Sequence, residues 1–167
     1  MIFEDIEGFA AVLPATACVI GLDLGTKTIG VALSDVMQSV ASPTETVKRS
    51  KFTQDAARLA KIAQARDAKG VILGLPRNMD GSEGPRAQST RAFARNLSRL
   101  PAFEGCAIGF WDERLSTVAA ERALLEADTS RKRRAELIDA VAASYILQGA
   151  LDRMRHIKAE KARASHE

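Results

Sequence analysis

The chain has 167 residues, of which 46% are hydrophobic and 27% are charged, a composition typical of a soluble globular protein with one sizeable core. Its net charge of +3 permits a nucleic-acid partner without requiring one. Aromatic residues make up only 5% of the chain, which excludes a broad platform for stacked bases as the main binding mode.

The lack of a recognisable targeting signal and the expected state of the cysteines favour a cytoplasmic location. No run approaches the roughly 20 apolar residues that a membrane span needs, and residues 1–10 are acidic where a secretory signal would be basic. We therefore expect a cytoplasmic protein without a membrane partner. Cys18 and Cys106 fall in apolar runs and are expected to be free, buried thiols, although a disulfide stays open if their strands are neighbours.

Apolar periodicity predicts alternating strands and helices after a short N-terminal extension. Two apolar runs joined by a glycine turn indicate a β-hairpin, and Pro43 makes the third strand an edge strand. A later strand–helix–strand order implies parallel crossovers, so we expect a mixed α/β fold that begins with an antiparallel meander. The predicted strands cover about 17–24, 28–35, 40–47, 71–75 and 106–111, and the predicted helices cover about 52–67, 86–99, 117–127 and 135 onward.

The pattern divides the chain into three segments. Residues 1–16 form the N-terminal extension, residues 17–152 form one domain, and residues 153–167 form a basic tail. We expect the tail to be a solvated helix end without an apolar face. Its cations are Arg153, Arg155, Lys158, Lys161 and Arg163.

Acidic residues occur where charge is costly. Asp23 is the only charge in the first strand, where it is either a structural aspartate bound to its own turn or a metal or phosphate site. Asp112 and Glu113 end the last strand, and Asp139 interrupts the apolar stripe of the final helix. Because ligands gather at the carboxyl ends of strands in open α/β sheets, we expect Asp23, Glu113 and Asp139 to meet at one edge.

Clustered carboxylates repel one another unless a cation is present. Mg²⁺ and Mn²⁺ prefer carboxylate oxygens, and one or two such ions can activate water in phosphodiester cleavage. The sequence therefore predicts a divalent metal site made by Asp23, Glu113 and Asp139, with Asp112 as a further candidate ligand. Each residue alone also has a structural interpretation, such as an ion pair between Asp112 and Arg114.

Four motifs in one order carry a family resemblance. They read GLDLGTKTIGVA from Gly21, GLPRNMDGSEG from Gly74, DERLST from Asp112 and IDAVAASYILQ from Ile138. Together they closely resemble the YqgF family of Holliday-junction-resolvase-like proteins, also described as pre-16S rRNA nucleases. The resemblance runs from about Val19 to Ala150, and the four motifs together make it highly specific.

The resemblance implies an RNase H-like fold with a mixed five-stranded sheet flanked by helices. It also implies a hydrolase that trims the 5′ end of precursor 16S ribosomal RNA, with the ribosome or its assembly intermediates as partners. The alternative function is that of a Holliday-junction resolvase, with branched DNA as the substrate. The catalytic carboxylates carried over are Asp23, Glu113 and Asp139, and the oligomeric state is left between monomer and homodimer.

Several basic and polar residues are candidates for binding the nucleic-acid backbone. Thr26 and Lys27 lie in the glycine turn, where a phosphate could approach, and Arg114 could pair with a carboxylate or stabilise transition-state charge. Arg77 and Asn78 follow a parallel strand, where a plain turn is an equal interpretation. The cluster Arg131, Lys132, Arg133 and Arg134 is expected to be a solvated loop that could also hold a backbone.

Two rival functions stay open. The Gly21–Lys27 stretch also resembles the phosphate loop of sugar kinases, actin and Hsp70-type ATPases, which use two such domains where this chain has room for one. A non-catalytic RNA-binding or ribosome-assembly module is the second rival, against which the presence of all three acidic residues argues weakly. Metal-dependent cleavage by the wild type and by an Asp139→Asn variant separates these functions.

Overall fold

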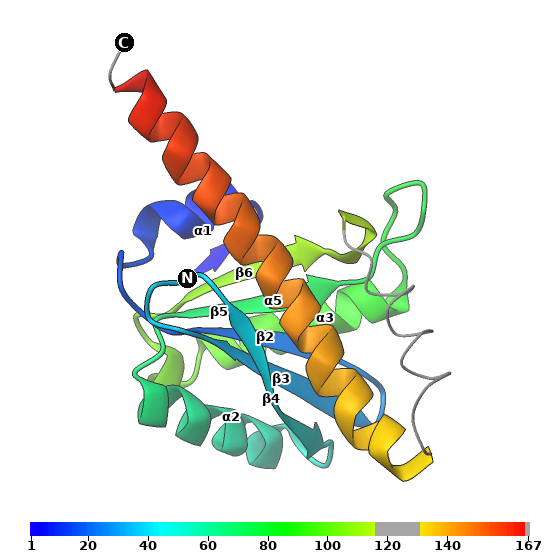
Figure 1. Cartoon of the computed structure of the whole chain (residues 1–167). Helices are drawn as coiled ribbons and strands as arrows, with labels where there is room; N and C mark the ends of the chain where they lie inside the picture. The colour runs from blue at the N-terminus through cyan, green and yellow to red at the C-terminus, as the bar shows by residue number, and fades with distance from the viewer. Residues whose placement is uncertain (116–130, 166–167) are drawn as a thin grey trace.

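The computed structural model of the chain describes residues 1–115 and 131–165, and the side chains of 1–115 and 138–165. A six-stranded mixed sheet forms the centre of the molecule, in the order β1-β6-β5-β2-β3-β4 (Figure 1). The strands are β1 (Ile2–Phe3), β2 (Val19–Leu24), β3 (Thr28–Ser34), β4 (Ala41–Lys48), β5 (Gly70–Leu75) and β6 (Ala107–Asp112).

The predicted meander and crossovers are confirmed. β2 pairs with β3 and β3 with β4 in antiparallel order, whereas β2 pairs with β5 and β5 with β6 in parallel order. The parallel strands β2, β5 and β6 consequently end at the same edge of the sheet. That edge carries Asp23 and is followed by Glu113.

The N-terminal extension adds a sixth strand to the five that were predicted. β1 pairs in parallel with Ile108 and Gly109 of β6, and α1 (Ile6–Val12) follows it directly. Phe9 of α1 is fully buried in the core. A strand of two residues has no periodicity that a sequence pattern could detect, so only the pairing with β6 identifies it.

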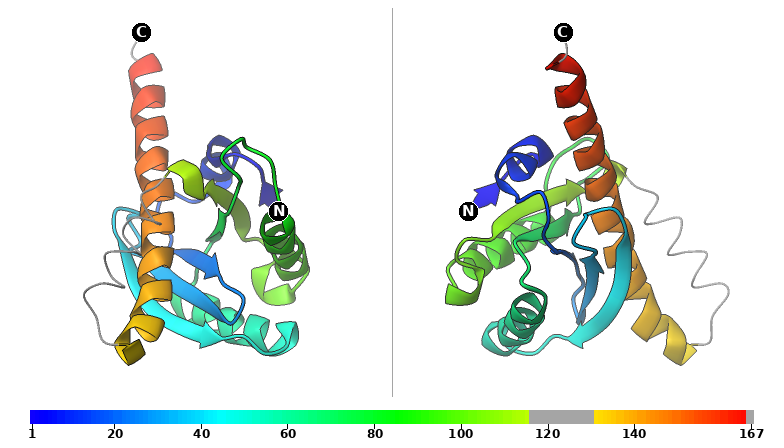
Figure 2. Two further views of the ribbon diagram at one scale, coloured as in Figure 1. Left: turned by 90° about the vertical axis from the view of Figure 1, so that its right-hand side faces the viewer. Right: turned by 60° about the vertical axis from the view of Figure 1, so that its left-hand side comes forward.

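Helices cover both faces of the sheet. α2 (Phe52–Arg66) and α3 (Pro85–Ser98) pack on one face, where their apolar residues join those of the sheet in one core cluster. α1 and α5 (Arg131–Ala164) pack on the other face in a second cluster. The two views of Figure 2 show α5 crossing its face of the sheet and continuing beyond it.

Two expectations about the C-terminal part were wrong. α5 begins at Arg131 rather than near 135, so the basic cluster 131–134 lies in its first helical turn and not in a loop. The predicted tail continues the same helix and does have an apolar face, because Met154 and Ile157 are buried in the α1–α5 cluster. These residues extend the stripe of Leu147 and Leu151 at helical spacing.

Other expectations have mixed outcomes. Cys18 and Cys106 are buried free thiols, and burial raises the pKa of both. The predicted helix at 117–127 lies outside the described residues. Among the helices that are described, none has both the length and the apolar character needed to cross a membrane.

Candidate active site

The carboxyl end of β2 is the centre of the candidate site. Asp23 is only 5% exposed and lies opposite Gly30 of β3 in the sheet register. Gly21 faces α5, because a Cβ there would lie 2.6 Å from Leu147 Cβ. Side chains two residues apart on a strand share a face, so Asp23 also points to the α5 side of the sheet.

Gly30 brings Asp139 next to this position. A Cβ on Gly30 would lie 1.9 Å from the carbonyl oxygen of Asp139, so only glycine lets α5 approach β3 this closely. The Thr28 hydroxyl donates a hydrogen bond of 2.5 Å to Asp139 Oδ2. Asp139 is therefore held over β3, the direct neighbour of β2.

Gly74 brings Glu113 to the other side of β2. Glu113 begins the 3-10 turn Glu113–Leu115 after β6, and a Cβ on Gly74 of β5 would lie 2.7 Å from Glu113 Oε1. β5 is the parallel neighbour of β2. Glu113 thus reaches across β5 toward the strand that carries Asp23.

The three acidic residues approach one strand end from three elements, but their side chains are not grouped around one position. Within the described side chains, no three His, Cys, Asp or Glu residues are grouped closely enough to hold a metal. The donors at this edge are all carboxylate oxygens, which is the ligand type that Mg²⁺ and Mn²⁺ prefer. The chemistry of the donor set therefore fits such an ion.

Asp112 has a different environment from the other acids. Its carboxylate accepts hydrogen bonds from Arg114, with Nη2 at 2.6 Å from Oδ2 and the backbone N–H at 2.9 Å from Oδ1. These hydrogen bonds lower the pKa of Asp112 below its ordinary value of 3.8. The structural alternative, an ion pair between Asp112 and Arg114, is therefore present in the molecule.

The glycine turn presents two of the predicted substrate residues to solvent. Thr26 and Lys27 are exposed, and the turn is closed by a hydrogen bond of 2.9 Å from Gly25 N to Thr28 O. Arg49, which the sequence did not single out, donates from Nη1 to the Gly25 carbonyl at 2.7 Å. Only the pairing of β3 with β4 brings Arg49 to this turn, so no local motif could have indicated it.

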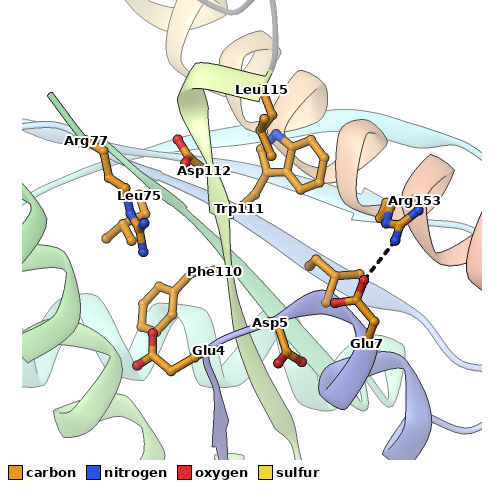
Figure 3. A pocket seen from close by; sticks show the side chains of 11 residues that line it. Glu4, Asp5, Glu7, Leu75, Arg77, Phe110, Trp111, Asp112, Leu115 and Arg153 are labelled. Atoms are coloured by element: carbon orange, nitrogen blue, oxygen red, sulfur yellow. Dashed lines mark hydrogen bonds and ion pairs between the residues drawn. The ribbon is translucent and has the colours of Figure 1, made fainter. Parts of the chain in front are cut away.

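The loop after β5 gives different environments to Arg77 and Asn78. Asn78 serves the turn itself, because its side-chain amide donates to the Ser82 hydroxyl at 3.0 Å. Arg77 lines a pocket of about 280 Å³ at the ends of β5 and β6, and its buried Nε has no hydrogen-bond partner among the described residues (Figure 3). Glu83 lies 3.5 Å from Arg77 Nη2. Arg77 therefore has one N–H group that no described acceptor uses.

Acidic residues surround much of that pocket. Glu4, Asp5 and Glu7 line it from the N-terminal segment, and Asp112 lines it from β6 (Figure 3). Glu7 forms an ion pair with Arg153 at 2.9 Å, drawn as a dashed line. Arg77 and Arg153 line the same pocket, so its four carboxylates share it with two guanidinium groups.

The last predicted group, Arg131 to Arg134, occupies the start of α5. Asp139 follows two turns later in the same helix, so the cluster and Asp139 are linked by a continuous helical segment. The side chains of 131–137 lie outside those described.

The strand order, the crossing helix and the acidic strand ends define an RNase H-like fold. The structure of Thermus thermophilus RuvC in complex with a Holliday junction substrate has this fold, with a TM-score of 0.52 at 17% identity over 83% of this chain and 96% of that chain. The chain belongs to the RuvX family, whose model, described as Holliday junction resolvase, matches residues 17–153.

Close relatives carry one shared name. A protein of Ruegeria sp. (strain TM1040) is 70% identical over 95% of this chain and 99% of its own length, and it is named "Putative pre-16S rRNA nuclease". A protein of Paracoccus denitrificans (strain Pd 1222) with the same name is 69% identical over 94% of this chain and 98% of its own length. The resemblance stated from the four sequence motifs is confirmed by these matches.

Proposed function

We propose that this protein is a metal-dependent nuclease that hydrolyses phosphodiester bonds of precursor 16S ribosomal RNA at its 5′ end. The observation that carries the proposal is the approach of Glu113 and Asp139 to Asp23 from opposite sides of β2, over Gly74 and Gly30. The names of the relatives, at about 70% identity over nearly the whole chain, support RNA as the substrate.

Each acidic residue has a defined part in this function. Asp23, fixed in the buried strand, Glu113 and Asp139 would hold one or two Mg²⁺ or Mn²⁺ ions, which supply water activation and stabilisation of the leaving oxygen when bound. Thr28 orients the Asp139 carboxylate through its hydroxyl. Lys27 and Thr26, exposed on the adjoining turn, bind a substrate phosphate beside the carboxylates.

Three basic segments complete the substrate surface in this proposal. Arg77 offers an unused N–H donor, Arg114 orders Asp112 beside Glu113, and Arg131 to Arg134 supply positive charge from the first turn of α5. Such contacts hold the backbone without reading the sequence, so binding weakens as salt rises. The activity belongs to the cytoplasm, where precursor ribosomal RNA is processed during ribosome assembly.

Cleavage of branched DNA is the second candidate, because the family model is described as Holliday junction resolvase. Cutting two strands of a junction symmetrically favours a homodimer, whereas a monomer suffices to trim an RNA end. A branched DNA and a precursor 16S RNA fragment, offered to the same preparation with its oligomeric state measured, separate the two substrates.

The deciding experiment compares the wild type with Asp139→Asn in Mn²⁺ and in Mg²⁺ on a precursor 16S RNA fragment. Loss of one metal ligand is expected to lower kcat by about 1,000-fold, since several kcal/mol of transition-state stabilisation are involved. Asp67→Asn is the matched control, because Asp67 is exposed at the C-terminal end of α2, on the face of the sheet opposite α5, and has the left-handed backbone conformation that asparagine accepts.

Metal binding gives a readout that does not depend on activity. Titration calorimetry with Mn²⁺ should show binding by the wild type and by Asp67→Asn, and much weaker binding by Asp139→Asn. Equal cleavage by all three proteins would remove Asp139 from the site. If the wild type cuts neither RNA nor branched DNA, a non-catalytic RNA-binding role becomes the better account.

A further inference from the structure

A groove lies at the end of the molecule opposite the candidate active site. It has a volume of about 180 Å³ and runs between the C-terminal half of α5 and the turn that joins β3 to β4, residues 35–40. Figures 1 and 2 show α5 projecting past the sheet at this end. The residues that line the groove are Met37, Gln38, Ser39, Leu151, Met154, Arg155 and Lys158.

The two walls of the groove are bonded to each other. The Gln148 side chain accepts from Ala41 N at 2.9 Å and donates to Ser39 O at 3.0 Å. Gln38 is buried and has φ +60°, and its amide donates to the carbonyls of Pro14 and Ala17. A residue other than glycine is rarely held in this backbone region without local hydrogen bonds to support it. The groove is therefore a built feature of the fold.

The charges that face the groove are positive. Arg155 Nη2 donates to Ser39 O at 3.1 Å, and Lys158 Nζ lies 3.4 Å from Gln38 Oε1. No Asp or Glu lines the groove itself, in contrast to the pocket at the ends of β5 and β6, and Asp152 borders it with Oδ1 3.7 Å from Arg155 Nη2. Both cations are exposed, and Lys161 lies one turn further along the same helix face. A groove lined by two cations and no carboxylate suits a phosphate group.

The groove and the candidate active site lie along one side of the molecule. β3 begins at Thr28, beside Asp139, and ends at Ser34, where the 35–40 turn begins. Along α5 the distance from Asp139 to Arg155 and Lys158 is about 24 to 28 Å at 1.5 Å per residue. At the 3.4 Å spacing of one strand of a duplex, this distance corresponds to about seven to eight nucleotides.

We propose that the groove between α5 and the 35–40 turn binds the phosphate backbone of the RNA substrate about seven to eight nucleotides away from the bond that is cut. This inference rests on the proposed nuclease function and deepens it. Substrates that extend past the cut gain affinity from Arg155 and Lys158, whereas short substrates do not reach them. The protein thereby favours long precursor RNA over short fragments.

The test is the double variant Arg155→Gln/Lys158→Gln. Its matched control is Lys61→Gln/Arg66→Gln, which removes one Lys and one Arg from the exposed surface of α2, on the opposite face of the sheet. Each protein is assayed on a 24-nucleotide RNA and on a four-nucleotide RNA with the same cleavage site. Binding of the long RNA is titrated from 50 to 300 mM salt, and circular dichroism confirms that the variants are folded.

The groove variant should raise KM for the long RNA by about tenfold at unchanged kcat, and should leave the short RNA unaffected. The slope of log K against log salt should fall by about 1.4, because two cations no longer contact single-stranded RNA. The control should behave like the wild type. An unchanged affinity and slope in the groove variant, or an equal loss in the control, overturns the proposal. If the wild type cleaves nothing, the nuclease function fails, and the binding titration still decides on the groove.

Discussion

The two faces of the central sheet are built in opposite ways. The face toward α2 and α3 carries large apolar side chains, such as Leu22 and Leu73, that fill the space beneath the helices. The face toward α5 carries glycines on three neighbouring strands, Gly21, Gly30 and Gly74. On the first face the large side chains keep the helices away from the sheet. On the second face the glycines have no side chain, so the helix backbone can contact the strands.

This difference explains where the polar groups meet. Asp23 faces α5, and the carbonyl group of Asp139 lies directly over Gly30. A layer of leucines on this face would push α5 outward by the thickness of a side chain and separate the carboxylates. Both faces bury an apolar cluster, but only the face toward α5 adds a close approach between acidic residues.

Among the substitutions that compare the two faces, Gly30→Ala should be the most damaging. A Cβ at this position would lie 1.9 Å from the Asp139 carbonyl oxygen, a contact that the rigid helix backbone must relieve by moving. Overpacking should cost about 3 kcal/mol of the free energy of unfolding. Displacing Asp139 by about 1 Å should lower kcat by about 100-fold, because catalytic geometry is that sensitive. Urea unfolding and single-turnover cleavage measure the two effects.

Leu73→Ala on the opposite face is the companion to Gly30→Ala. Leu73 is fully buried, so its truncation should also cost about 3 kcal/mol through lost burial and the cavity left behind. Its kcat should stay within about twofold of the wild type at a temperature where the variant is folded. A similar loss of kcat in both variants would mean that activity follows stability and not the position of Asp139.

A smaller effect is expected for Thr28→Val, which keeps the side-chain shape and removes the hydroxyl that bonds Asp139. Residues that orient metal ligands typically change metal affinity by 10- to 100-fold, and we expect about tenfold weaker Mn²⁺ binding by calorimetry. Thr28→Ser should restore it, because serine keeps the donor. Normal Mn²⁺ affinity in Thr28→Val would show that Thr28 does not orient Asp139.

The smallest effect should come from Arg114→Gln and should depend on pH. Arg114 lowers the pKa of Asp112 below 3.8, so the ion pair stabilises the fold above this value. The stabilisation is lost as pH falls through the lowered pKa of Asp112 in the folded protein. We therefore expect the variant to have a slightly lower Tm than the wild type at pH 7 and an equal Tm near pH 2. A Tm difference that stays constant over this range would assign the effect to packing.

Most of the fold could be predicted from the sequence, because its elements have clear local signals. The helix expected at 52–67 is α2 at Phe52–Arg66, and the strand expected at 71–75 is β5 at Gly70–Leu75. The apolar residues recur at helical spacing in α2 and form a continuous run in β5. Both patterns follow from which side chains the fold buries. β1 was missed because its partner lies about a hundred residues away.

The candidate site, too, was only partly predictable from the sequence. The sequence indicated Asp23, Glu113 and Asp139 because a charge within or beside an apolar run is costly and needs a reason. It gave no sign that Thr28 bonds Asp139 or that Arg49 supports the glycine turn. Both contacts join segments that are separated along the chain, by 111 residues in the first case and by 24 in the second. The environment of Asp112, bound by Arg114, likewise became clear only from the folded chain.

The sequence by itself determined the order of the strands and helices, the acidic residues at the strand ends and the family, since each depends on local periodicity or on motifs. Tertiary structure alone decided that glycines face α5, that Thr28 holds Asp139, and that the basic tail is a helix packed through Met154 and Ile157. The physical reason is that strand register and helix–sheet distance depend on contacts between remote segments, which no local pattern specifies.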